Sequence, residues 1–441
     1  MLFLIISQAD RLMYMYPLTF KDLMPMKRIA HISFILAIIL TAFDMSIWAQ
    51  KNEIISSHIA SLQVTTGEEW QEPPIKVLGD RSPIYIDFDD MTHEYHRYAY
   101  KLEHCDADWS TSDQLFQSDY TSGIAENIAI DDAEESVNTN TQYTHYRLTI
   151  PNDNFSIKMS GNYRLTVFDD NSDKIIFKAY FLVVEPLLNV SITVSTNTDI
   201  DVNNSHQQIG MDIKYNNLSV SNPDEQIKTV ILQNFRWDNC KVNIKPDYKK
   251  NDGLQWIHNR DLIFNAGNEY HKFEMVDVDH PTMGIENMDW NDNEYNAYLW
   301  ANEPRLSYVY DKDANGAFYI RNRDDVNSNT ESEYINVHFF LKSPHLNGDV
   351  FINGAWTNDQ LTEPFKMKWD EEKQVYSNTM LLKQGYYSYQ YVLVNPDGES
   401  VPVPSDGNFY QTENKYYALV YYHGNGERTD RLVGYSQVET K

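Results

Sequence analysis

Cysteine, basic residues and long apolar runs are all scarce in this 441-residue sequence. Two cysteines, Cys105 and Cys240, cannot build a disulfide scaffold, and they form either one bridge or two buried thiols. The 36 Lys and Arg residues stand against 64 Asp and Glu, a net charge of −28, which excludes the clustered basic surface that nucleic-acid binding needs. The longest apolar run, residues 29–43, is shorter than the roughly 20 residues of a membrane-spanning helix.

That apolar run indicates export from the cytoplasm. It directly follows Met26, Lys27 and Arg28, and it is followed by a small residue, Ala49, which is typical of a signal peptide cleaved before Gln50. A retained membrane anchor is the alternative. Residues 1–25 are either an extension upstream of a true start at Met26 or a long charged region of the signal. We therefore interpret residues 1–49 as an upstream extension plus a signal peptide.

Short runs of alternating apolar and polar residues recur along the rest of the chain, and alternation is the period of a β-strand. The 31 Tyr, 19 Phe and 9 Trp residues favour such half-buried strands. The clearest runs are 84–88, 95–103, 143–150, 163–168 and 175–184. Turn dipeptides follow at Asn315-Gly316, Asn347-Gly348, Asn353-Gly354, Asp397-Gly398, Asp406-Gly407 and Asn425-Gly426. The sequence predicts an all-β fold of immunoglobulin- or fibronectin-like β-sandwich modules in series.

Two breaks divide the predicted strands into three modules. Pro186 interrupts strand pairing after residue 184, and a polar stretch without strand signals covers 324–332. We therefore expect a first β-sandwich module at 50–186, a second β module at 187–328 and a third, immunoglobulin-like module at 329–441. Within the first module, the acidic and Asn/Thr-rich segment 122–142 is predicted to be a long exposed loop.

The sequence contains none of the common catalytic motifs. There is no G-x-S-x-G, no C-x-x-C, no P-loop and no G-x-G-x-x-G. Adjacent acids such as Asp89-Asp90 point to opposite faces of a strand, so each doublet alone cannot form a glycosidase pair. We therefore expect a non-enzymatic protein without catalytic residues or cofactors.

Two segments resemble metal sites in part. His96 and His104 lie about 26 Å apart if they share a strand, so they cannot bind one metal ion together. The segment His104-Cys105-Asp106 is instead predicted to pack at the strand end and cap a turn. Asp311, Asp313 and Asn315 begin a calcium-loop pattern, but Asn322 stands where the bidentate Glu is needed. We expect no metal, with a hairpin turn at 311–316 and a calcium-binding β-loop as the weaker alternative.

The tyrosines of the last module are candidates for contact with a partner. Alternation places Tyr387, Tyr389 and Tyr391 on one face of a strand, either as an exposed aromatic strip or packed inside a sandwich. Arg428, Arg431 and Tyr435 are further contact candidates, although both arginines could instead pair with acids of this chain.

Several strings, taken in order, resemble the type IX secretion system plug proteins of Bacteroidetes. The first module contributes 100–113, 143–148 and 161–167, the second 266–273 and 310–319, and the last 382–391, 412–416 and 427–435. The resemblance spans nearly all of the chain after residue 49. The segment 353–364 matches only loosely, and with 376–391 it is also similar to glycogen-binding immunoglobulin-like modules.

The resemblance implies a periplasmic protein on the inner side of the outer membrane, peripheral to it and not spanning it. Its implied partner is the giant outer-membrane β-barrel translocon of the secretion system, whose periplasmic end such a plug seals when no cargo is engaged. A periplasmic or surface glycan-binding β-sandwich protein is the alternative function, and a secreted cargo of the same system is a third.

Overall fold

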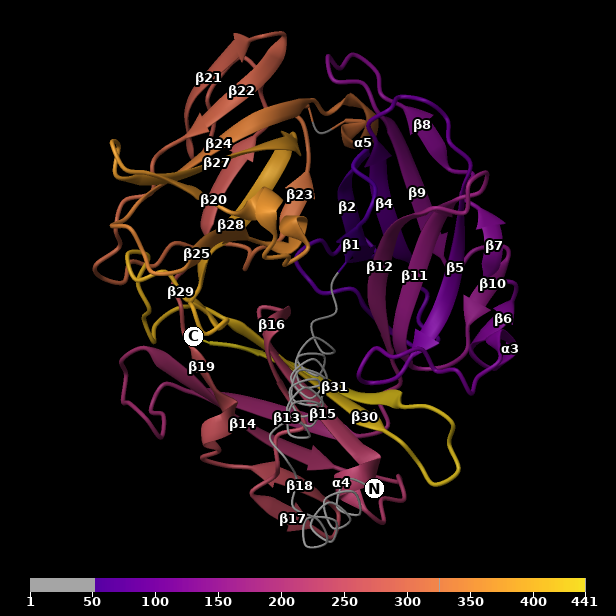
Figure 1. Cartoon of the computed structure of the whole chain (residues 1–441). Coiled ribbons are helices and arrows are strands. Elements are labelled where there is room, and N and C mark those ends of the chain that lie inside the picture. Colours follow the sequence, from indigo (N-terminus) through magenta and orange to yellow (C-terminus); the bar gives the residue numbers. More distant parts are fainter. Residues whose placement is uncertain (1–51, 325, 441) are drawn as a thin grey trace, which may run out of the picture. The chain divides into compact units, whose positions relative to one another are not determined.

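The computed structural model describes residues 52–324 and 326–440. The predicted signal peptide, the retained-anchor alternative and the possible start at Met26 lie outside these residues. Within them, none of the helices has the length and hydropathy of a membrane span. Nearly all regular secondary structure of the described chain is β-strand, arranged in mainly antiparallel sheets (Figure 1), which confirms the predicted all-β fold of sandwich modules.

The first module, which comprises β1 to β12, is a sandwich of two main sheets. One sheet contains β1 (Glu53–Ile54), β12 (Ile175–Val184), β11 (Gly161–Asp169), β5 (Tyr98–Cys105) and β7 (Glu126–Ala129) in this order, with β3 (Ile75–Val77) parallel to β12. The other contains β2 (Ile59–Thr66), β4 (Ile84–Asp90), β9 (Thr144–Ile150) and β8 (Ala133–Glu135). The helix α3 (Gln117–Tyr120) and the pair β6 (Thr121–Gly123) and β10 (Phe155–Ile157) complete it. The expected loop at 122–142 thus carries the short strands β7 and β8.

The second module combines β13 to β19 with the last two strands of the chain. One sheet contains β13 (Asn189–Ser195), β14 (His206–Lys214), β18 (Gly253–Trp256) and β17 (Tyr248–Lys250), with β19 (Ile263–Asn265) beside β14. The other contains β16 (Arg236–Val242), β15 (Ile227–Gln233), β30 (Lys415–Tyr422) and β31 (Arg431–Glu439). The short helices are α4 (Pro223–Gln226) and η1 (Arg260–Leu262).

The third module comprises β20 to β29. The long strand β28 (Gly385–Val394) pairs with β20 (His271–Met275), β23 (Phe318–Ile320), β25 (Asp349–Asn353) and β29 (Ser400–Pro402). The other sheet contains β21 (Ile285–Asn291), β22 (Glu294–Leu299), β24 (Tyr334–Lys342), β27 (Val375–Lys383) and β26 (Lys368–Asp370). The short helices are α5 (Ser328–Glu331), η2 (Ala355–Thr357) and η3 (Glu363–Phe365).

Strands from the two sides of the expected boundary between residues 328 and 329 pair with each other in the same sheets. Strand β15 pairs with β30 from Ile227↔Tyr422 to Gln233↔Tyr416, and β20 pairs with β28. The modules therefore differ from the contiguous segments 187–328 and 329–441, because the third module is inserted between β19 and β30. Alternation reveals that a segment is a strand, but it does not identify the hydrogen-bonding partner when that partner is distant in the chain.

The sheet β16-β15-β30-β31 buries apolar side chains on both of its faces. Tyr416, Ala418, Val420 and Tyr422 of β30 lie in the core of the second module. The alternate residues Tyr417, Leu419 and Tyr421 pack instead in a separate cluster with Trp109, Tyr180 and Leu182 of the first module. This shared cluster, which we call the central interface, joins the two modules.

Leu432 tests the contribution of the central interface to stability, because it is fully buried there on β31. Leu432→Ala should lower the free energy of unfolding by about 2–5 kcal/mol, the usual cost of a buried Leu-to-Ala cavity. Urea unfolding followed by tryptophan fluorescence measures it. The control Glu439→Ala, at the exposed end of the same strand, should stay within about 0.5 kcal/mol. Equal effects of the two variants would contradict this account.

Candidate functional site

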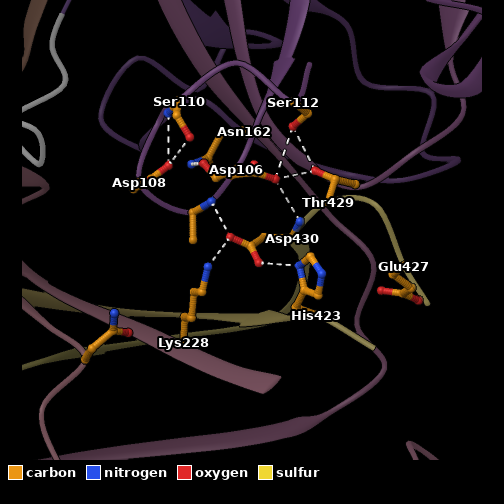
Figure 2. Close-up of polar contacts among 12 residues, drawn as sticks. Asp106, Asp108, Ser110, Ser112, Asn162, Lys228, His423, Glu427, Thr429 and Asp430 are labelled. Atoms are coloured by element: carbon orange, nitrogen blue, oxygen red, sulfur yellow. Dashed lines mark hydrogen bonds and ion pairs between the residues drawn. The ribbon is translucent and has the colours of Figure 1, made fainter. Parts of the chain in front are cut away.

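Three segments distant in the sequence meet at the end of β5 (Figure 2). They are the turn after β5, the start of β11 and the loop between β30 and β31. We call their shared polar group the motif junction, and it consists of His104, Asp106, Ser112, Asn162, Thr429 and Asp430. All three segments belong to the strings that resemble the plug family.

Asp106 binds the C-terminal loop to the first module. Its Oδ1 accepts hydrogen bonds from the backbone N of Asp430 at 2.9 Å, from Thr429 Oγ1 at 2.5 Å and from Ser112 Oγ at 3.2 Å. Its backbone carbonyl accepts from Asn162 Nδ2 at 2.9 Å. Asp106 therefore caps a turn that lies more than 300 residues further along the chain, whereas the cap of its own turn is Asp108, bonded to Ser110.

Asp430 makes the reciprocal contact from the loop to the first module. Its Oδ2 accepts from the backbone N of Ala107 at 3.0 Å and from Lys228 Nζ at 2.7 Å, and its Oδ1 lies 3.0 Å from His423 Nδ1. Burial alone raises the pKa of Asp430, but Lys228, the Ala107 amide and His423 outweigh it, so the pKa lies below the usual value. The side chain is 1% exposed, and its charge is fully paired.

His104 fixes the start of β11 against β5. Its Nε2 donates to the carbonyl of Ser160 at 3.1 Å, and its Nδ1 lies 2.9 Å from Ser112 Oγ. Burial lowers the pKa of His104, which favours the neutral ring. Gly161 has φ 151°, and a Cβ there would lie 2.1 Å from His104 Nε2, so only glycine fits.

The Ser, His and Asp of the motif junction do not form a hydrolytic triad. In a triad the carboxylate orients the histidine, whereas Asp106 accepts directly from Ser112 Oγ. Ser112 is 5% exposed and also bonds to Thr429 Oγ1 at 2.8 Å. This chemistry holds backbone segments together, as the predicted packing and capping role of His104-Cys105-Asp106 requires. Neither Cys105, whose pKa burial raises to about 12, nor Cys240 takes part in a disulfide.

A buried ion pair joins the first and third modules, as the motif junction joins the first and second. Lys383 Nζ lies 2.6 Å from Asp89 Oδ2, with the two side chains 2% and 1% exposed. Tyr334 OH donates to the same oxygen at 2.6 Å, and Lys383 lies over the Tyr143 ring at 4.1 Å. Burial raises the pKa of Asp89, but Lys383 and His145 bring it below the usual value. Sequence reasoning missed this pair, since one acid among 64 carries no local sign of burial.

The predicted tyrosine strip lies in the core. Tyr387, Tyr389 and Tyr391 are each 2% exposed and pack between the sheets of the third module. Tyr389 OH and Tyr391 OH both donate to Asn302 Oδ1, at 2.9 and 2.7 Å. Since such side chains cannot reach the surface of a partner, the packed alternative describes these residues and the exposed strip does not.

The other contact candidates mostly bind within the chain. Arg428 pairs with Asp119 at 2.8 Å and donates to the carbonyl of Gln114 at 3.0 Å. Arg431 pairs with Glu185. Tyr435 is half-buried and stacks on Tyr417 with ring centroids 6.5 Å apart. Both arginines therefore pair with acids of this chain, which was the alternative to partner contact. These pairs hold β31 and the loop before it against the first module.

The acids of the segment 311–316, which resembles a calcium loop, bind other groups of the chain. Asp311 Oδ1 lies 2.5 Å from Lys272 Nζ, and Asp313 accepts from the backbone N of Asn315 at 2.6 Å and from the backbone N of Tyr270. Over the part of the chain that the structure describes, no group of three or more His, Cys, Asp or Glu residues is arranged to hold a metal. Residues 306–310 form no strand, so the expected hairpin is absent there.

Removing the charge of Asp430 tests the motif junction. Asp430→Asn should lower the free energy of unfolding at pH 7 by about 1–3 kcal/mol, because Lys228 loses its ion pair. Because the pKa of Asp430 is lower in the folded protein than its unfolded value of 3.8, the charged side chain stabilises the fold at pH values above 3.8. The stability difference between wild type and Asp430→Asn should therefore vanish as the pH falls below 3.8. The control Asp108→Asn, in the same turn, should change stability little. A loss with Asp108→Asn as large as with Asp430→Asn would refute a specific role for the junction.

Asp313 predicts a pH dependence of opposite sign. Burial, with a contribution from Glu269, raises its pKa to about 7, above the unfolded value of 3.8. The folded protein therefore keeps a proton that the unfolded chain has lost, and stability falls by up to about 1.4 kcal/mol per unit as pH rises from 4 to 7. Asp313→Asn should flatten this slope, whereas the exposed control Asp311→Asn should not. Parallel stability curves for wild type and Asp313→Asn between pH 5 and 8 would contradict the assignment.

Comparison of the chain with known proteins finds a matching family model and a similar crystal structure. Residues 59–185, from β2 to the end of β12, match the family model of the type 9 secretion system plug protein first domain. The crystal structure of a hypothetical protein from Parabacteroides merdae ATCC 43184 is 39% identical, with a TM-score of 0.85, and covers 88% of this chain and 99% of that chain. No curated protein matches the chain significantly.

Two streptococcal structures also align with most of the chain, at very low similarity. The C-terminal domain of the Streptococcus pyogenes antigen I/II-family protein AspA covers 86% of this chain and 98% of its own, with 6% identity and a TM-score of 0.17. The C-terminal domain of the Streptococcus agalactiae polypeptide BspA covers 88% and 97%, with 6% identity and a TM-score of 0.15. Neither supports an argument about fold.

The family match and the motifs that meet at the junction agree, and the chain belongs to the type IX secretion system plug family.

Proposed function

We propose that this protein is a non-enzymatic plug that seals the periplasmic end of the outer-membrane β-barrel translocon of type IX secretion when no cargo is engaged. The match of residues 59–185 to the first domain of the plug proteins is the observation that carries the proposal. The central interface and the two polar contacts support it, because a body that closes a pore must keep its shape.

The contact surface that we propose for the barrel is the loop between β22 and β23. Two polar residues of this loop bind inward: Arg305 donates to Asp406 Oδ1 at 2.7 Å, and Tyr308 OH donates to Glu269 Oε1 at 2.6 Å. The apolar residues Leu306 and Val309 are instead 89% and 71% exposed. Exposed apolar residues that gather in one loop mark a candidate interaction surface.

Deletion of the gene in its own host tests the plug. Loss of the plug should leave the barrel open, so the cells should become sensitive to vancomycin, which an intact outer membrane excludes. Growth inhibition measures the effect. A double deletion that also removes the barrel should restore resistance. Sensitivity that persists without the barrel, or never arises although cargo is still exported, would refute the plug function.

Complementation of the same strain tests the contact loop. The variant Leu306→Asp/Val309→Asp should fail to restore resistance and should not copurify the barrel. Val202→Asp, which introduces a charge at another apolar residue, 66% exposed and on the second module, should behave like wild type. Equal unfolding midpoints of the purified proteins show that folding is intact. Full complementation by the double variant would place the contact elsewhere and leave the plug proposal standing.

A further inference from the structure

The hairpin of β21 and β22 in the third module has one open edge. Strand β22 lies between β21 and β24, whereas β21 pairs with β22 alone among the described strands and is the outer strand of its sheet (Figure 1). In the described chain no backbone group of residues 286–291 bonds to a segment outside the hairpin. Such an edge can pair with one more strand.

Both faces of β21 are open as well. A surface strand that covers a core buries every second side chain. In β21 three consecutive residues, 289–291, are exposed, so no core covers this end of the strand. Five of its seven residues are exposed in all: Glu286, Asn287, Asp289, Trp290 and Asn291. An added strand can therefore place side chains over either face.

Trp290 presents a large aromatic ring at this edge. Its side chain is 47% exposed and packs edge to face on Tyr295, its partner in the register, with ring centroids 4.5 Å apart. Proteins usually protect an edge strand from pairing by keeping it short or by placing Pro or Lys in it. β21 is seven residues long and contains neither. A solvent-exposed tryptophan beside an unprotected edge is typical of a contact with another protein.

The charges around the hairpin define the partner. Residues 273–304, which include the hairpin, contain eight Asp and Glu and no Lys or Arg. Arg321 and Arg323 pair with Glu274 and Asp277, which precede the hairpin, so the hairpin itself stays negative. A second copy of β21 would bring like charges together across the new pair of strands, which is unfavourable. A positively charged strand is complementary.

We propose that β21 binds an extended, positively charged segment of another protein as an additional strand. Backbone hydrogen bonds to the open edge provide affinity for any extended chain, and side chains provide selectivity. Trp290 packs on apolar side chains of one face of the added strand, and Asp289 attracts Lys or Arg on the other face. The residues differ from those of the contact loop, and the inference does not depend on the plug function.

Fluorescence anisotropy of a labelled peptide at low salt tests the site on the purified protein. The probe alternates lysine and valine, as Lys-Val-Lys-Val-Lys-Val-Lys, and it should bind saturably with a Kd below about 1 mM. The same peptide with two adjacent prolines at its centre keeps the charge but loses backbone donors, so it should bind about tenfold more weakly. No saturable binding of the probe, or equal affinity of the proline peptide, would overturn the proposal.

Hydrogen exchange measured by mass spectrometry locates the contact. A saturating concentration of the probe should slow the exchange of amides in residues 286–291, because an added strand accepts hydrogen bonds from the outward N–H groups. Exchange in β13, an edge strand of the second module, should not change. Binding of the probe without protection of residues 286–291 would overturn strand addition at β21.

Matched variants separate this surface from general attraction to an acidic protein. Glu286→Lys/Asp289→Lys should weaken binding of the probe about tenfold, whereas Glu371→Lys/Glu372→Lys, in an exposed turn of the same module, changes the net charge equally and should have little effect. Trp290→Ala should weaken binding about fivefold, and Trp300→Ala, 59% exposed and outside the hairpin, should not. Equal effects within each pair of variants, at equal unfolding midpoints, would overturn the assignment.

Discussion

The burial of both faces of β30 constrains the rest of the structure. Its alternate residues enter two different cores, with Tyr416 and Val420 in the second module and Tyr417 and Leu419 in the central interface. Because a strand buried on both faces is apolar throughout, it must be covered by two layers at once. The outer face of β12 supplies one layer, through Tyr180 and Leu182. Since β30 comes near the end of the chain, the first module completes its packing only when the last strands are in place.

Apolar packing joins the modules, and the polar contacts orient them. Hydrophobic burial has little directional preference, so a flat interface of tyrosines and leucines alone would permit sliding. The hydrogen bonds of Asp106 and Asp430 fix the first module against the second, and the Asp89–Lys383 pair fixes it against the third. A buried ion pair contributes little net stability relative to apolar packing, but it strongly penalises arrangements that leave either charge unpaired. The three modules therefore hold one relative placement.

The local part of this fold could be predicted from the sequence, and the long-range part could not. Alternation located strands such as Ile84–Asp90 closely, because it depends only on neighbouring residues. The same signal cannot tell an exposed strip from a second core, so it leaves both placements open for Tyr387. Gly354 was assigned to a turn, but its φ of −175° is extended, and glycine is needed there because a Cβ would meet Trp356 and Ser388. Asp430 belongs to a recognisable string, yet its partners Ala107 and Lys228 are set only by the fold.

A cavity between the modules follows from the same assembly. Each sandwich closes around its own core, and the space where three such bodies meet, about 150 Å³, is lined by turns as well as by strands, with Asn234, Asn315 and Asn358 among the turn residues. Turns carry polar side chains and positive φ angles, which explains why unpaired amide oxygens and backbone strain occur together there.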